Sequence, residues 1–271
     1  MFTVLGYEFM QHALAAAVLA GIACGVVGTY VVVRRMVFVS GGISHATFGG
    51  VGLALWLGFN PILGAVAFAL AAAMGMGVVT RRTRLSEDAS IGVLWVTGMA
   101  LGVVFAGLAA GYTPDLFSYL FGNILTVLTS ELQLMLLLDG VIVATVLAFY
   151  KEFQAVSFDE EFSRVAGVPA GALQLVLLAL IALTIVTVIR VVGIVLVIAL
   201  ITIPPSIARQ YTTTLSGMMR LSVALGVALS VCGIALSYVL DIPSGATIVL
   251  LGGLVLALVL LAKRLRPTRS A

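Results

Sequence analysis

A histidine in a long apolar stretch is the first residue of this sequence that could do chemistry. We interpret His45, within SGGISHATFGG at 40–50, as the only histidine inside a segment long and apolar enough to cross a membrane. An imidazole is costly in hydrocarbon, and ionisable residues there usually face a bundle interior or a solute pathway. Because imidazole is also the commonest metal ligand among side chains, His45 is a candidate to line a path for a transition-metal ion.

Small residues surround this histidine. Three positions share its face at helical spacing and carry no side chain, which would leave open space beside the imidazole: Gly41, Gly49 and Gly52. A structural interpretation is also open, in which the imidazole hydrogen-bonds to Ser44, Thr47 or a neighbouring helix and the glycines only allow close packing. We therefore predict that these three glycines and Ser44 either line the pathway or pack helices together.

A carboxylate in the apolar segment 131–150 is the second candidate. A charge near the middle of a bilayer must be paired, hydrated or protonated, so Asp139 is a candidate metal ligand by default. The alternative is that the segment slides and Asp139 lies in a wet cleft, because hydropathy does not fix the ends of a span.

The composition indicates what kind of protein must position these side chains. Only 9% of the 271 residues are charged, 62% are hydrophobic, and the mean hydropathy is +1.24. Soluble domains carry about 25% charged residues, so we predict an all-α polytopic integral membrane protein. The basic residues end apolar segments and form no patch for nucleic acid. No P-loop, HExxH or GxSxG motif is present, and we expect neither enzymatic activity nor a cofactor.

Nine apolar segments approach the roughly 20 residues that cross a bilayer. They cover about 11–33, 42–58, 61–80, 90–110, 131–150, 171–189, 191–208, 219–240 and 245–262. The sixth and seventh nearly touch at 190–193, so eight full spans plus re-entrant pieces is an alternative. The fold prediction is therefore eight to nine transmembrane helices in one domain, 1–271.

The placement of charge predicts the orientation. With the N-terminus outside, every lysine and arginine except Arg190 falls on the inner side, which is the skew of the positive-inside rule. We expect a multi-pass protein of a prokaryotic inner or plasma membrane, surrounded by lipid, with a cytoplasmic C-terminus.

One apolar stretch lacks the uninterrupted pattern of a simple membrane span. Residues 113–130 are interrupted by Pro114, Gly122 and Asn123. We predict a partly embedded helix there, and an amphipathic surface helix is the alternative.

The longest predicted cytoplasmic loop, at about 151–170, contains a short amphipathic helix. Ser157 or Asp159 can cap its start, and Gly167 and Pro169 can end it. An acidic polar face would repel anionic lipid, so a protein partner is favoured over the membrane surface. The residues on its apolar face are Phe158, Phe162 and Val165.

Four stretches, 34–46, 156–169, 192–209 and 236–250, together resemble the membrane permease subunit of the ABC-3 type importers for zinc, manganese or iron. The resemblance spans nearly the whole chain. It implies a homodimer with a central pore, two cytoplasmic ATP-binding subunits, and an extracytoplasmic protein that delivers the metal. His45 matches the pore histidine of the family, and the loop helix matches the coupling helix that docks into the ATPase. The residues expected to couple are Phe158, Asp159, Glu160, Phe162, Arg164 and Gly167.

The sequence departs from the family at one position. Many members have an aspartate four residues before the pore histidine, whereas this chain has Gly41. Nitrogen ligands suit zinc and oxygen ligands favour manganese, so we favour zinc, although Asp139 or backbone carbonyls could supply oxygen. The alternatives are a manganese or iron permease, an ATP-independent carrier or channel, and a permease for a bulky chelate. The permeases that a chelate transporter would resemble are longer chains with about ten spans.

Overall fold

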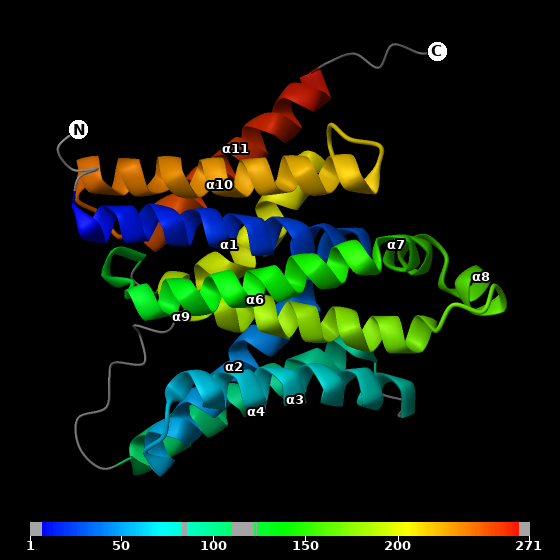
Figure 1. Ribbon diagram of the computed structural model, residues 1–271, viewed down its shortest axis with the longest axis horizontal. Helices are drawn as coiled ribbons and strands as arrows, with labels where there is room; N and C mark the ends of the chain where they lie inside the picture. The colour runs from blue at the N-terminus through cyan, green and yellow to red at the C-terminus, as the bar shows by residue number, and fades with distance from the viewer. Residues whose placement is uncertain (1–6, 83–85, 110–121, 123, 266–271) are drawn as a thin grey trace.

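The computed structural model describes residues 7–82, 86–109, 122 and 124–265, and over these residues the chain is helical and contains no strand. The helices, drawn in Figure 1, are α1 (Glu8–Val33), α2 (Val37–Leu57), α3 (Pro61–Arg82), α4 (Glu87–Leu108), the short 3-10 helix η2 (Ile124–Thr126), α6 (Thr129–Ala148), α7 (Tyr150–Phe158), α8 (Glu160–Val165), α9 (Ala170–Ala208), α10 (Leu215–Leu240) and α11 (Ser244–Leu265).

Nine helical stretches among the described residues are long and apolar enough to cross a membrane. This confirms the predicted all-α polytopic fold and supports the higher of the two expected span numbers. Two of the nine, Ala170–Ile189 and Val191–Ala208, belong to α9.

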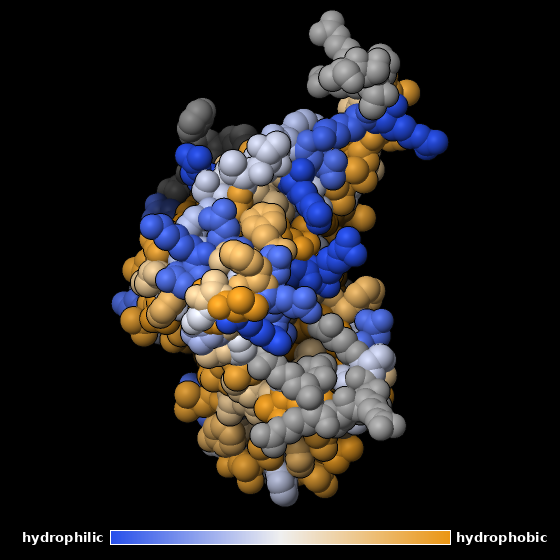
Figure 2. All heavy atoms as spheres, turned by 90° about the vertical axis from the view of Figure 1, so that its right-hand side faces the viewer, coloured by the Kyte–Doolittle hydropathy of each residue, from blue (hydrophilic) through white to orange (hydrophobic). Residues whose placement is uncertain are grey.

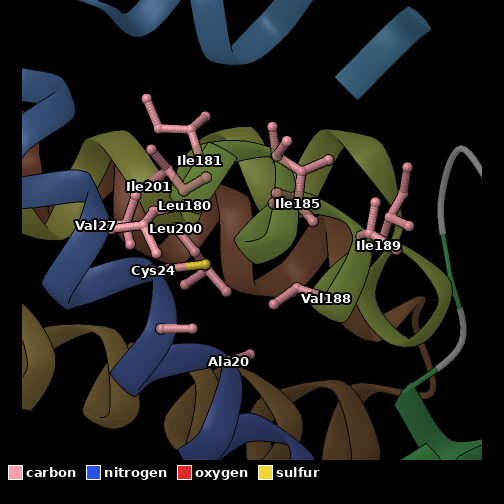
Figure 3. Close-up of a cluster of buried hydrophobic side chains, with 14 of the residues drawn as sticks. Ala20, Cys24, Val27, Leu180, Ile181, Ile185, Val188, Ile189, Leu200 and Ile201 are labelled. Carbon is pink, nitrogen blue, oxygen red and sulfur yellow. The ribbon is translucent and has the colours of Figure 1, made fainter. Parts of the chain in front are cut away.

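A break at Gly193 divides α9 into these two spans. Its φ of 80° and ψ of 163° are not helical, and glycine adopts a positive φ without steric cost. Leu180 and Leu200 lie in one cluster of buried side chains (Figure 3), although twenty residues of straight helix would separate them by about 30 Å. The chain therefore turns back at the break, without the loop that usually separates two spans.

Helix α9 lies at the centre of the bundle and contacts α1, α2, α3, α6, α10 and α11. On one side of it α2 packs against α3 and α4, and on another α1 packs against α10 (Figure 1). Small side chains make such burial possible: Ala20 and Cys24 of α1 are buried, and the backbone of Gly25 lies against Val223 of α10. Small residues let helices approach closely, which is how membrane helices gain packing energy.

The two irregular stretches have different outcomes. The predicted embedded helix at 113–130 falls largely outside the described residues. Within the part that is described, η2 forms one short turn and α6 begins at Thr129. The short helix predicted within the loop at about 151–170 is α8, which follows Asp159 and ends before Gly167. The sequence did not predict α7 before it, and Phe158, expected on the predicted helix, belongs to α7.

Candidate metal site

His45 lies on α2, half-buried, eight residues after the helix begins. Its Nδ1 is 2.8 Å from the carbonyl oxygen of Gly41, one turn earlier. A carbonyl oxygen can only accept, so Nδ1 carries the proton and donates. In the neutral ring the lone pair then belongs to Nε2, because the hydrogen bond of one ring nitrogen sets the state of the other. The imidazole is thus oriented with Nε2 as its free ligand atom.

The indole of Trp95, on α4, stacks on this imidazole. The ring centroids are 3.9 Å apart and the planes differ by 21°. Trp95 also lies against Gly41, since a Cβ added there would be 3.3 Å from the indole ring. The missing side chain at Gly41 therefore leaves room for the indole, and the indole holds one face of the histidine ring.

Sequence reasoning missed Trp95. It lies fifty residues from His45, in an ordinary apolar span, and no local pattern indicates which way that helix is turned. A tryptophan in a span usually marks the membrane interface, so its type gave no signal of contact with the histidine.

The other small residues near His45 have packing roles. A Cβ added at Gly49 would be 2.8 Å from the ring of Phe68, and one added at Gly52 would overlap the backbone of Gly102. The expectation of open space beside these glycines is wrong, and the close-packing interpretation holds. The Ser44 hydroxyl is buried and donates to the Ser40 carbonyl oxygen at 2.8 Å.

A hollow of about 270 Å³ lies beside Trp95 at the ends of α2 and α4 where both helices begin. It is lined by Phe38, Asp88, Ile91, Gly92 and Trp95. The hollow therefore reaches the indole that stacks on His45, at helix ends that the charge pattern predicts to be cytoplasmic. Asp88, which the sequence analysis did not single out, supplies its carboxylate.

Asp139 lies at the middle of α6 and is 4% exposed. Both carboxyl oxygens are buried, and neither has a hydrogen-bond partner among the described residues. The wet-cleft alternative therefore fails. Helix α6 packs against α1 and α9, whereas α2 packs against α3, α4 and α9. Within one chain the structure does not bring Asp139 to His45.

A second histidine also lies in a span, so the interpretation of His45 as the only one is wrong. Helix α1 begins at Glu8, which places His12 in its second turn. The Nδ1 of His12 is 3.1 Å from the Val127 carbonyl oxygen, and Nε2 is 3.9 Å from the Glu8 carboxylate. Over the described residues, no three or more His, Cys, Asp or Glu side chains are grouped so as to hold a metal ion.

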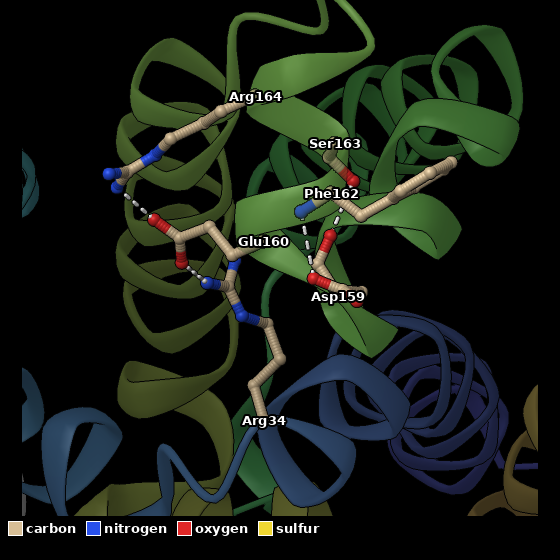
Figure 4. Close-up of polar contacts among 6 residues, drawn as sticks. All are labelled: Arg34, Asp159, Glu160, Phe162, Ser163 and Arg164. Carbon is tan, nitrogen blue, oxygen red and sulfur yellow. Dashed lines mark hydrogen bonds and ion pairs between the residues drawn. The ribbon is translucent and has the colours of Figure 1, made fainter.

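Within the expected coupling segment, α8 begins and ends at residues that the sequence predicted. Asp159 lies between α7 and α8 and separates the two helices. Its Oδ1 accepts a hydrogen bond from the N–H of Phe162 at 2.9 Å (Figure 4). This confirms Asp159 as a helix cap. Past the end of α8, Gly167 has a φ of 83°, the left-handed conformation that commonly ends a helix.

The apolar face of this segment is uncovered. Phe158 is 67% exposed, Phe162 68% and Val165 88%. Figure 2 looks at the end of the bundle that carries α7 and α8, where hydrophilic residues gather over the middle and hydrophobic ones form the flanks. Large apolar side chains at a hydrophilic end are typical of a protein-binding surface.

Comparisons with known proteins agree with this architecture. The sequence matches the ABC 3 transport family over residues 6–263. An uncharacterized membrane protein of Synechocystis sp. is 44% identical over 254 residues, covering 94% of this chain and 90% of that protein. The manganese transport system membrane protein MntC of Listeria monocytogenes is 33% identical over 249 residues, covering 92% and 89%.

A solved structure, PsaBC from Streptococcus pneumoniae in complex with Fab, has the same fold. Its TM-score is 0.86 at 31% sequence identity, and the match covers 98% of this chain and 95% of that one. The family match covers most of the sequence, and so do the alignments with these relatives. The chain is therefore a member of the ABC 3 transport family.

Proposed function

We propose that this protein is the membrane permease subunit of an ATP-driven importer for a divalent transition metal. The observation that carries the proposal is the free Nε2 of His45, held inside a membrane span by the Gly41 carbonyl oxygen and the Trp95 indole. An imidazole with one nitrogen fixed by a backbone acceptor is the usual arrangement of a metal-ligating histidine. Because the chain belongs to a transport family, the metal that such a histidine would bind is the transported one.

The working unit is a homodimer with two cytoplasmic ATP-binding subunits and an extracytoplasmic metal-binding protein. The described residues hold no group of three or more His, Cys, Asp or Glu side chains that could bind a metal ion. In the proposed homodimer, His45 of the second copy adds a further nitrogen ligand across a central pore. ATP binding closes the ATPase subunits, which move α7 and α8 through the exposed Phe158, Phe162 and Val165. The spans then alternate between outward-open and inward-open arrangements. The orientation follows the positive-inside rule, with an outer N-terminus.

Zinc is the proposed metal. The turn of α2 before His45 offers an imidazole and a backbone carbonyl, with Gly41 where a carboxylate would favour a harder ion. Manganese is the second candidate, because relatives such as the Listeria monocytogenes MntC are named for manganese transport.

Reconstitution of the complete complex tests the proposal. The permease, its ATP-binding subunit and its binding protein are placed in proteoliposomes, and uptake of zinc, manganese and iron is measured with and without ATP. We expect ATP-dependent uptake, highest for zinc, and ATP hydrolysis stimulated by the same metal. Uptake that proceeds fully without ATP would instead support a carrier or channel, and uptake of none of these metals would refute the proposal.

A further inference from the structure

The connection between α1 and α2 is short and fixed. It consists of Arg34, Arg35 and Met36. The Met36 N–H donates to the Val31 carbonyl oxygen at 2.8 Å, and Arg35 has a φ of 59°, in the left-handed region that usually takes glycine. These are the features of a Schellman helix end. A displacement of Arg34 therefore passes directly to the first turn of α2, the helix that carries His45.

Glu160 of α8 reaches this connection. Its Oε2 accepts a hydrogen bond from Arg34 Nη2 at 3.1 Å, and its Oε1 accepts one from Arg164 on the next turn of α8 (Figure 4). The Arg34 side chain is only 11% exposed and that of Glu160 31%. Exposed ion pairs contribute little to stability, but a pair that is largely removed from water has a strongly preferred geometry and is costly to break.

A second contact joins the same two parts of the chain. The ring of Phe153, on α7, lies 5.5 Å from that of Tyr30, in the last turn of α1, and both side chains are buried. The segment α7–α8 is thus held to the end of α1 at two points. The apolar contact opposes separation of α7 from the end of α1. The ion pair joins α8 itself to Arg34, the residue that begins the turn into α2, and so fixes where α8 lies relative to that turn.

The two faces of α8 have different partners. Phe162 and Val165 are exposed and available to another protein, whereas Glu160 and Arg164, one turn apart, form the ion-pair side. We propose that Glu160 is a positioning residue whose bond to Arg34 carries movement of the coupling segment to α2 and His45. This inference rests on the proposed function, since it assumes that an ATPase moves α7 and α8.

The test separates docking from transmission. Glu160→Gln and Arg34→Gln are each assembled with the ATP-binding subunit and the binding protein in proteoliposomes. ATP hydrolysis, metal uptake and co-purification of the ATPase are measured together. Arg34 lies on the connection after α1 rather than on α7 or α8, and its side chain is only 11% exposed, so we expect assembly and ATP hydrolysis to persist in its variant. Uptake per ATP should fall by about fivefold or more, the lower end of measured coupling between sites.

Two comparisons sharpen this experiment. Glu161→Gln makes the same charge change one position away, on an exposed side chain, and should leave uptake per ATP at the wild-type value. In the double variant of Arg34 and Glu160 the loss of uptake per ATP should equal that of either single variant, because each single variant already removes the bond between Arg34 and Glu160. Additive losses would mean that the two residues act separately, and would overturn the inference.

The remaining outcomes are also decisive. An unchanged uptake per ATP in both single variants would overturn the link, and so would loss of the ATPase from Glu160→Gln together with wild-type behaviour of Arg34→Gln. Should Glu160→Gln fail to fold, Glu160→Asp keeps the charge but shortens the reach, and normal coupling in that variant would equally refute the link. Absence of metal uptake in the wild-type complex would instead refute the proposed function.

Discussion

His45 and Asp139 are both ionisable side chains inside membrane spans, yet their surroundings are opposite. His45 is half-buried, with Nδ1 bound to a backbone carbonyl oxygen and one ring face held by Trp95. Asp139 is 4% exposed, and within the described part of the chain neither carboxyl oxygen has a hydrogen-bond partner. The first side chain is oriented to receive a ligand, whereas the second is closed off within its own subunit. Both residues were candidate metal ligands in the sequence, with His45 the leading one, so an ionisable side chain in a span does not by itself identify a transport site.

Removing the imidazole should have the largest effect. His45→Ala is expected to lower metal uptake by about a hundredfold or more, since loss even of outer groups around a metal costs 10–100-fold. Uptake into proteoliposomes measures this, with size-exclusion chromatography to establish assembly. His12→Ala is the matched control, because His12 is also a span histidine with Nδ1 at a carbonyl oxygen. Equal losses in the two variants would remove the distinction that gives His45 its role.

Truncating the coupling surface should have the next largest effect. In Phe158→Ala combined with Phe162→Ala, two exposed aromatic side chains are lost, and we expect ATPase binding to weaken by about tenfold or more, since such anchors dominate interfaces. Co-purification and uptake measure the change. Leu147→Ala, which truncates an exposed residue of α6, should bind the ATPase normally. Undiminished binding in the Phe variant would assign this surface another role.

Restoring a carboxylate beside His45 tests selectivity. The contact of Gly41 with Trp95 predicts that Gly41→Asp alone crowds the indole and lowers uptake of zinc and manganese together. Gly41→Asp combined with Trp95→Ala makes room for the new ligand, so the ratio of manganese to zinc uptake should rise by about tenfold. Competition uptake measures the ratio, with Trp95→Ala alone as the control. A ratio that does not differ between the double variant and this control would exclude Gly41 from selectivity.

Neutralising Asp139 should have the smallest effect on transport. Asp139→Asn keeps the size of the side chain and removes a buried acid that has no hydrogen-bond partner among the described residues, which is a costly arrangement. We expect the melting temperature to rise by about 2–4 °C, as a gain near 1 kcal/mol gives in a chain of this size, and uptake to stay within about threefold of the wild type. Thermal unfolding in detergent and uptake check both. A loss as large as that of His45→Ala would place Asp139 on the metal path.

The sequence could predict what depends on nearby residues. Span length, the cap at Asp159 and the end of α8 before Gly167 follow from hydropathy, side-chain acceptors and backbone freedom within a few positions. Residue type and hydropathy singled out His45, the amphipathic pattern indicated the loop helix, and the family resemblance added the roles expected of both. The turn at Gly193 was only suggested, because two spans that nearly touch can be joined by a loop or by a break in one helix.

What depends on the rotation of packed helices could not be predicted. The stack of Trp95 on His45 and the bond of Glu160 to Arg34 join residues far apart in the sequence. The glycines beside His45 looked like a lining of open space, whereas Phe68 and Gly102 of neighbouring helices fill that space. A pattern along one helix shows which residues share a face, but the partner of that face is set by tertiary packing.

The central claim is that Nε2 of His45 binds the transported metal. X-ray absorption at the zinc edge tests it most directly, on the purified complex loaded with zinc and on the same complex with His45→Ala. We predict imidazole nitrogen scattering at about 2.0–2.1 Å, the usual zinc–nitrogen distance, in the wild type and its loss in the variant. An identical spectrum in both, or a wild-type spectrum with oxygen ligands alone, would contradict the assignment of His45 as a ligand.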